Sequence, residues 1–381
     1  MNAGAERARG EQTALVHDYL LTPRGAERTF AVMAECWPQA PIHTLLYDAE
    51  AMRELLGERE VRTSVLQRLG HDQQDFRRLL PLFPLAISRL LEGEPRLVVS
   101  SSSAFAHGVS IPEGAVHVCY CHSPFRYAWH ERERALEEAR PWQRPLLRPL
   151  LSAIQRWDRR AADRVTHYVA NSRITQQRLN RFYGIEAPII HPPVAVERFG
   201  ERTVEPEDYF VFVGEVTRHK RVELAIEAAQ RAKVRLVVVG AGPDLERLRA
   251  LHGSSVRFTG RVDDRELVDL VSRARAQIVP NVEEFGIAAV EAQAAGRPVL
   301  AAAAGGALET VLDGETGVLF EPGSAEALAG ALREAAFDQF DPARARANAE
   351  RFSTAAFRSR LSAEVARLSG QPQAASDATS A

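Results

Sequence analysis

A chain of 381 residues, of which 45% are hydrophobic and 26% charged, has the composition of a folded protein with more than one core. Its formal net charge of −2 excludes a general attraction to nucleic acid, and its three cysteines exclude a disulfide framework. No apolar run approaches the length of a transmembrane helix, and residues 1–12 lack the apolar core of a signal peptide. Together these features predict a cytoplasmic protein.

Short apolar runs alternate with helical patterns along the chain. Residues 14–16, 97–99 and 117–120 form such runs in the first half, and residues 209–213 and 234–239 form them in the second. Continuous apolar strands joined by helices are typical of parallel sheets that helices cover on both faces. The predicted fold class is therefore α/β, with two doubly wound, Rossmann-like domains.

The strand pattern restarts after the polar, acidic segment 201–208. We therefore predict a first domain over residues 13–207 and a second over residues 208–352. Residues 353–369 have the pattern of a final helix. Residues 370–381 are rich in alanine, serine and glutamine and predict a disordered tail.

One stretch departs from the regular alternation of strands and helices. Residues 140–164 contain seven arginines but only two acidic residues, and apolar side chains recur between them at helical spacing. This pattern predicts an amphipathic helix with a basic flank, and residues 77–83 are a second, shorter candidate. Two interpretations stay open: a helix packed on the core with its arginines in water, or a surface that touches anionic lipid and a lipid-linked acceptor.

Two polar motifs follow apolar runs of the first half. Gly25 allows a turn from the first strand into a helix. His122 follows the run 117–120, where the ligands of open α/β sheets bind beyond the carboxyl ends of the strands. A lone histidine at this place can also be structural. Arg126 could pair with a phosphate of an acceptor or cap its own helix.

In the second half, Lys220 lies in the loop after the first strand. No acidic pair of the D-x-D type and no His/Cys cluster has the spacing of metal ligands. We therefore expect no metal cofactor.

The segment 276–295 carries the strongest functional signal. An apolar strand leads to Glu283 and Gly286, a helix follows, and Glu291 lies on that helix. Glycine permits close backbone approach, the first N–H groups of a helix bind anions, and carboxylates accept hydrogen bonds from hydroxyl pairs. This combination suits a nucleotide sugar, in which a diphosphate joins two polyols. Alternatively, Glu283 could complement the helix dipole and Glu291 could be a solvated helix residue.

Glu283 and Glu291 match the E-x7-E motif of retaining glycosyltransferase family 4, whose members have the GT-B fold. The chain resembles this family from about residue 14 to residue 357. The other matching pieces are Val213-Gly214, Lys220-Arg221, 239–243, 258–260, Gly305-Gly306 and 313–317. The resemblance implies two Rossmann-like domains that face each other across a cleft, with the final helix crossing back to the first domain.

The resemblance also implies roles for single residues. It makes His122 and Glu283 catalytic residues at the reacting sugar, and Arg126 is the candidate for acceptor binding. Donor binding falls to Gly25, Lys220, Glu283, Phe285, Gly286, Ile287 and Glu291. Within this set Glu291 is expected to bind ribose hydroxyls, and Lys220 with the backbone of 285–287 is expected to bind the diphosphate.

The chain departs from the family pattern at two positions. Arg24 stands where the family has the first glycine of a Gly-Gly pair, so only Gly25 corresponds to that pair. Glu215 stands where the family has a phosphate-binding arginine, and Arg218 or Arg221 is a candidate for the missing charge. The second departure bears on the phosphate site and on the identity of the donor.

The implied function is transfer of a hexose from a nucleotide sugar to a growing glycan, with the anomeric configuration retained. Residues 121–127 resemble bacterial mannosyltransferases of surface-polysaccharide assembly, which favours GDP-mannose as donor over a UDP-hexose. The acceptor would be a glycan, lipid-linked and reached by peripheral contact with the inner face of the cell membrane. The alternatives are a nucleotide-sugar epimerase of the same fold and a non-catalytic nucleotide-sugar-binding subunit.

Overall fold

The computed structural model describes residues 12–69, 76–200 and 204–370. The predictions about a signal peptide and a disordered tail concern residues 1–12 and 370–381, which lie outside the described residues except for Gln12 and Gly370. The chain divides into two compact units. The first contains the described residues up to Ile190 together with those from Arg358 onward, and the second is His191–Phe357.

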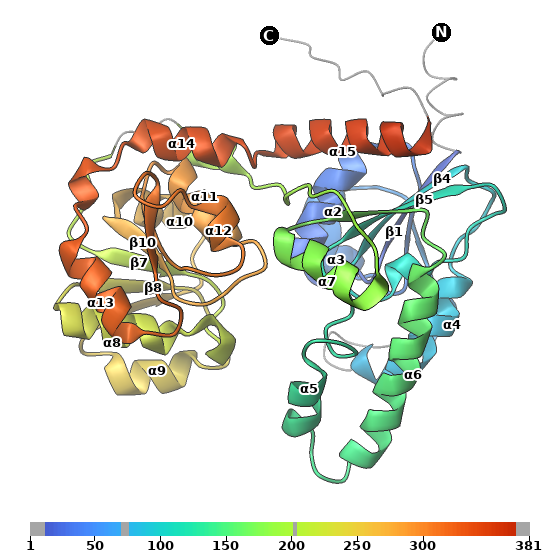
Figure 1. Ribbon diagram of the computed structural model, residues 1–381, viewed down its shortest axis with the longest axis horizontal. Helices are drawn as coiled ribbons and strands as arrows, with labels where there is room; N and C mark the ends of the chain where they lie inside the picture. The colour runs from blue at the N-terminus through green and yellow to red at the C-terminus, as the bar shows by residue number, and fades with distance from the viewer. Residues whose placement is uncertain (1–11, 70–75, 201–203, 371–381) are drawn as a thin grey trace, which may run out of the picture. The chain divides into compact units, whose positions relative to one another are not determined.

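A six-stranded parallel sheet forms the centre of the first unit (Figure 1). Its strands are β1 (Thr13–His17), β2 (Ile42–Thr44), β3 (Val61–Thr63), β4 (Leu97–Ser102), β5 (Val116–Cys121) and β6 (His167–Ala170). The strand order is β3-β2-β1-β4-β5-β6. This is the doubly wound order, and it reverses between β1 and β4, where the carboxyl ends leave a crevice for ligands.

Helices cover both faces of this sheet. They are α2 (Gly25–Glu35), α3 (Ala49–Leu56), α4 (Phe83–Ser88), α5 (Arg132–Glu138), α6 (Arg144–Ala162) and α7 (Arg173–Tyr183), with 3-10 helices η1 (Val65–Leu69), η2 (Phe76–Leu82) and η3 (Ala106–Gly108). On one face Val98 packs in a cluster with Ile154 of α6. Residues of opposite parity point to the other face, where His17 stacks on Phe30 of α2 at 4.7 Å between ring centroids.

The second unit repeats the same topology. Its strands are β7 (Phe210–Val213), β8 (Leu236–Val239), β9 (Arg257–Gly260), β10 (Ala276–Val279), β11 (Val299–Ala302) and β12 (Gly317–Phe320). They form a parallel sheet of order β12-β11-β10-β7-β8-β9. The order here reverses between β7 and β10, which places the expected ligand crevice of this unit at their carboxyl ends.

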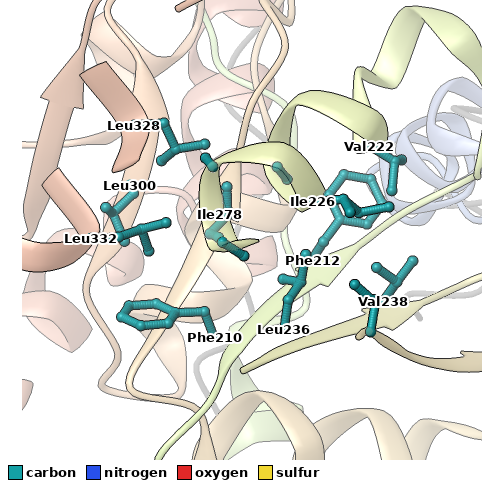
Figure 2. Packing of buried hydrophobic residues seen from close by; sticks show 14 of the residues in the cluster. Phe210, Phe212, Val222, Ile226, Leu236, Val238, Ile278, Leu300, Leu328 and Leu332 are labelled. Atoms are coloured by element: carbon teal, nitrogen blue, oxygen red, sulfur yellow. The ribbon is translucent and has the colours of Figure 1, made fainter. Parts of the chain in front are cut away.

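Two helical layers enclose the second sheet. The helices are η4 (Val196–Phe199), η5 (Arg218–Lys220), α8 (Val222–Ala232), α9 (Leu245–His252), α10 (Asp264–Arg273), α11 (Ile287–Ala294), α12 (Ala307–Thr310), α13 (Ala325–Glu334), η6 (Phe337–Gln339) and α14 (Pro342–Glu350). A last helix, α15 (Thr354–Ser369), follows them in the sequence. Phe212 and Val238 pack in a cluster with residues of α8 and α13, such as Ile226 (Figure 2). Val211 and Val237, the alternate residues, pack in another cluster with α10.

The two Rossmann-like units confirm the predicted fold class, but the division between them lies at Ile190 rather than at residue 207. The reason is that the chain joins the second unit before its first strand begins. Val194 donates its N–H to the carbonyl of Phe352 at 2.8 Å, and Phe199 is buried in the core of the second unit. The acidic segment 201–208 therefore precedes the second sheet, but not the second unit.

The predicted final helix over 353–369 corresponds to α15. Its residues from Arg358 onward group with the first unit. Arg358 forms an ion pair with Glu35 of α2 at 2.6 Å, and the Cys36 thiol lies 4.0 Å from the Arg358 carbonyl. The helix therefore belongs in sequence to the end of the second unit and packs largely with the first.

The basic stretch forms α6, as its periodicity predicts. Its second half packs on the core through Ile154 and the buried Asp158, whereas Leu146 near its start is 70% exposed and Trp142 just before it is 65% exposed. Figure 1 shows α5 and α6 extending together beyond the sheet of the first unit. Residues 77–83 fall in η2 and the start of α4, not in one amphipathic helix. Within the described ranges, no helix has both the length and the apolar character needed to cross a bilayer.

Candidate functional site

The loops after β7 and β10 meet at the strand-order reversal of the second unit. Lys220, in η5 after β7, donates from Nζ to Oε1 of Glu283, in the loop after β10, at 2.5 Å. Asn281 Nδ2 contacts the same oxygen at 3.3 Å. Lys220 and Glu283 were expected to bind the same ligand. They are hydrogen-bonded to each other, although 63 positions separate them in the sequence.

Gly286 gives the loop after β10 its turn into α11. Its φ of 91° lies in the left-handed region that glycine adopts without strain, and it is the residue before the first helical position. A side chain added at Gly286 would lie 3.9 Å from Oε2 of Glu283, so that carboxylate oxygen lies close to the start of α11. The first N–H groups of a helix lack partners within the helix and favour anions.

Gly306 fixes this loop from the other side. Its N–H donates to the carbonyl of Glu283 at 2.8 Å. A Cβ at Gly306 would lie 2.2 Å from the Phe285 carbonyl oxygen, so only glycine allows the two backbones to approach so closely. Sequence analysis matched Gly305-Gly306 to the family without giving it a role, and the structure assigns it the support of the Phe285–Gly286 turn.

Glu291 lies on α11 one turn beyond Ile287, and its partner is Arg198. The Arg198 Nη2 donates to Glu291 Oε1 at 2.6 Å, and Nη1 lies 3.7 Å from Asp264 Oδ1. The side chains of Glu291 and Arg198 are 16% and 24% exposed. The interpretation of Glu291 as a solvated helix residue is therefore wrong. Sequence analysis missed Arg198, because no local motif links it to Glu291, 93 positions away.

A pocket of about 610 Å³ lies beside this ion pair. Its lining residues are Glu197, Arg198, Phe199, Gly200, Asp264, Arg265 and Val268. The pocket borders the start of α10, which follows the loop at residues 261–263.

Glu215 stands in place of the family's phosphate-binding arginine, and the cation that hydrogen-bonds to Glu283 is Lys220. Glu215 is exposed. Arg218 lies near Asp244, whose pKa is lowered mainly by a hydrogen bond from Arg247 and further by the charge of Arg218. Arg221 has a left-handed backbone, and its guanidinium lies against Gly323. Among the described residues, no three His, Cys, Asp or Glu side chains gather as metal ligands.

Gly240 and Gly242, which lie in the matching piece 239–243, have a packing role. A Cβ at Gly240 would lie 1.9 Å from the Gly214 carbonyl oxygen, and one at Gly242 would lie 2.3 Å from that of Val216. These glycines let the loop after β8 pack directly on the loop after β7. They therefore support the backbone that leads to Lys220.

The first unit contains the remaining predicted residues. His122 follows β5, is 8% exposed and lies 2.8 Å from Ser101 Oγ through its Nε2. Burial lowers the pKa of His122 to about 4, so the imidazole is neutral at neutral pH. Arg126 lies exposed four residues later. It caps no helix of its own, because its carbonyl accepts from Trp129 and Glu131 N–H groups before α5 begins.

Gly25 begins α2, as the strand-to-helix turn predicts. The neighbouring Asp18 lies at the strand-order reversal between β1 and β4. Its buried carboxylate accepts N–H donors of Ser103, Phe105 and Ala106 at 2.6–2.7 Å, which ties the loop after β1 to the loop after β4. The observed role of Asp18 is therefore structural.

Comparison with known proteins agrees with this geometry. The sequence profile described as Glycosyltransferase Family 4 matches residues 23–198, and the profile described as Glycosyl transferases group 1 matches residues 195–352. A D-inositol 3-phosphate glycosyltransferase of Streptomyces avermitilis is 32% identical over 212 residues, which are 47% of this chain and 45% of that protein. The D-rhamnosyltransferase WbpZ of Pseudomonas aeruginosa is 32% identical over 133 residues, 33% of this chain and 35% of that protein. Each alignment thus covers less than half of the relative's length.

The Anabaena protein HepE, solved in complex with UDP, superposes with a TM-score of 0.69 over 93% of this chain and 100% of its own, at 18% identity. HepE has also been solved with UDP-glucose. At this identity the likeness concerns the fold. Two doubly wound sheets and two consecutive family profiles over residues 23–352 lead to one conclusion: a domain similar to Glycosyltransferase Family 4 is followed by one similar to Glycosyl transferases group 1.

Proposed function

We propose that this protein is a retaining glycosyltransferase that moves a hexose from a nucleotide sugar to a growing glycan. The observation that carries the proposal is the Lys220–Glu283 pair at the β7/β10 strand-order reversal, beside the left-handed Gly286 at the start of α11. An ammonium group, a helix N-terminus and a carboxylate are the groups that a sugar diphosphate needs.

The chemistry follows from these groups. The bond between the anomeric carbon and the diphosphate breaks, and the departing diphosphate gains negative charge. Lys220 and the first N–H groups of α11 stabilise this charge. Glu283 accepts hydrogen bonds from sugar hydroxyls through lone pairs that Lys220 leaves available, since a carboxylate can accept about four. The resemblance to retaining enzymes supports attack by an acceptor hydroxyl from the face that the leaving group vacates, without a protein nucleophile. The hydroxyl oxygen bonds to the anomeric carbon, and its proton passes to the departing diphosphate.

His122 has a second role in this proposal. Because its imidazole is neutral, it acts near the sugar as a hydrogen-bonding group and not as a cation. Ser101 holds its Nε2, which fixes the ring orientation. Its catalytic assignment rests on the family resemblance, and so do the roles of Gly25 in donor binding and Arg126 in acceptor binding.

Two observations bear on the donor. The motif at 121–127 supports GDP-mannose, whereas the bound nucleotide of the Anabaena relative supports a UDP-hexose. We propose GDP-mannose as first donor and UDP-hexoses as the alternative. The exposed Glu215 in place of the family arginine favours a second candidate function, a non-catalytic nucleotide-sugar-binding subunit. The common fold leaves a nucleotide-sugar epimerase as a third.

Turnover with a panel of GDP- and UDP-sugars in the presence of EDTA tests this proposal, with products identified by mass spectrometry. We expect release of nucleoside diphosphate with the hexose on an acceptor or on water, because Lys220 and α11 replace a metal. Activity that disappears in EDTA and returns with Mg²⁺ or Mn²⁺ would show that the site uses a metal. An isomerised nucleotide sugar would indicate an epimerase, and binding without chemistry would indicate a binding subunit.

We also propose that the arm formed by α5 and α6 contacts anionic membranes and brings the enzyme to a lipid-linked acceptor. Trp142 and Leu146 are exposed apolar side chains near the start of α6. Arg156 and Arg160 are exposed on the same helix, and together with Trp157 they line a pocket of about 530 Å³. An apolar tip combined with exposed guanidinium groups is typical of surfaces that bind anionic lipid.

Co-sedimentation with vesicles decides whether this arm binds lipid. Binding to anionic vesicles at low salt is expected to be worth about 1 kcal/mol per basic residue and to weaken as salt rises. Exchanging Arg156 and Arg160 for glutamate should abolish most of it. The same exchange at Arg53 and Arg360, exposed residues of the first unit outside α6, is the matched control. Equal binding of both double variants, or no binding at any salt concentration, would leave α6 as a solvated helix.

A further inference from the structure

We infer that Arg198 is a positioning residue for the donor, which holds Glu291 in the orientation that binds the ribose diol. The inference rests on the proposed function. Arg198 Nη2 donates to Glu291 Oε1 at 2.6 Å. The two glutamates are held in the same way. Arg198 donates to Oε1 of Glu291, and Lys220 donates to Oε1 of Glu283.

The guanidinium of Arg198 is itself held in place. It lies 5.1 Å above the ring of Phe199, which is 2% exposed in the core of the second unit. The segment before it is tied to the end of the unit by the 2.8 Å hydrogen bond from Val194 to Phe352. Because the Arg198 guanidinium is fixed, it restricts the side-chain rotamers of Glu291, to which it is hydrogen-bonded. Glu291 therefore loses little further conformational entropy when a ligand binds.

Charge balance gives Arg198 a second effect at this place. Glu291 and Asp264 both lie within 3.7 Å of its guanidinium. Without Arg198, two uncompensated carboxylates would stand beside the pocket and would repel an anionic nucleotide. The Nε of Arg198 is also buried without a hydrogen-bond partner, and a buried donor of this kind is normally satisfied by an acceptor.

The competing explanation is that the pair only fastens η4 to α11. A fastening role and a positioning role differ in what they do to the recognition of the ribose. A fastening residue changes stability and lowers the affinity for all nucleotides alike. A positioning residue changes the preference for a nucleotide that carries the 2′- and 3′-hydroxyls over one that lacks them.

Calorimetric titration therefore compares GDP and UDP with their 2′,3′-dideoxy counterparts. We expect the wild-type protein to prefer the diol by about ten- to a hundredfold, the range for hydrogen bonds to a charged group. Arg198→Gln should reduce this preference to roughly that of Glu291→Gln, and the double variant should reduce it no further, because the two residues act as one unit. Arg198→Lys, which keeps the charge but not the forked geometry, should fall between wild type and Arg198→Gln.

Arg231→Gln is the matched control, because Arg231 also lies between two carboxylates of the second unit, Glu227 and Glu326, away from the pocket. It should keep the wild-type preference. A wild-type diol preference in any Arg198 variant that folds would overturn the inference and leave the proposed function intact. Failure of the wild-type protein to bind either nucleotide would overturn the proposed function together with the inference. If Arg198→Gln does not fold, the Arg198→Lys preference decides alone.

Discussion

Replacing Glu283 or His122 by alanine is expected to lower turnover about a hundredfold or more, while nucleoside diphosphate still binds. The magnitude is that found when one group that stabilises a transition state is removed. Both residues are assigned to the reacting sugar and neither to the nucleotide. The change should therefore fall on kcat at saturating donor, and calorimetric affinity for the free nucleotide should change little.

Glu284 supplies the matched control for Glu283. It is the adjacent carboxylate on the same loop, and its alanine variant should keep turnover near the wild-type value. Because Lys220 bonds directly to Glu283, Glu283→Gln is a useful third variant that retains a hydrogen-bond acceptor for the ammonium. Equal loss of turnover in the Glu283 and Glu284 variants would point to a damaged loop instead of a catalytic role.

For His122 the second informative substitution is His122→Asn. Asn can keep one hydrogen bond toward Ser101 and so preserves the local packing around the end of β5. We expect His122→Asn to fold like the wild type and to be as slow as His122→Ala. Near wild-type turnover in either variant would remove His122 from the reaction and leave it as a buried structural histidine.

The elements that position the site could be predicted from sequence because parallel strands are short, continuous apolar runs. The strand before Glu283 and the glycine-led helix after it were expected within residues 276–295, and they form as β10 and α11. Likewise His122 was expected directly beyond a strand and lies directly beyond β5. In each case a local pattern of apolar and turn residues determines the outcome.

Pairings across the fold could not be predicted in this way. The bonds from Lys220 to Glu283 and from Arg198 to Glu291 join residues 63 and 93 positions apart. Each depends on which loops the doubly wound strand order brings together, and no spacing in the sequence encodes it. For the same reason the unit boundary was placed too late, since the packing of Phe199 in the second core leaves no periodic signal.

Glycine was the most ambiguous residue in the sequence. Gly286, Gly240 and Gly306 are equally conspicuous there, but only Gly286 forms the turn into the helix that is expected to bind the diphosphate. Gly240 and Gly306 are required because another backbone approaches within about 2 Å of where a Cβ would lie, at 1.9 and 2.2 Å. A motif match alone cannot distinguish ligand contact from such packing.

The central claim is that the segment containing Glu283, Gly286 and Glu291 binds the nucleotide part of a sugar donor. Glu291→Ala should weaken binding of GDP or UDP by about 1–3 kcal/mol, because a charge-assisted hydrogen bond to ribose is lost. This corresponds to roughly five- to more than a hundredfold in Kd. Loss of Glu291 also leaves Arg198 without its partner, so thermal unfolding of the variant must accompany the titration.

Calorimetric titration of GDP and UDP into the wild-type protein and the Glu291→Ala variant is the most direct measurement. The account predicts saturable binding of one nucleotide to the wild type, and binding to a folded Glu291→Ala variant that is at least about fivefold weaker. Unchanged affinity in a folded variant, or no binding of either nucleotide to the wild type, would contradict it.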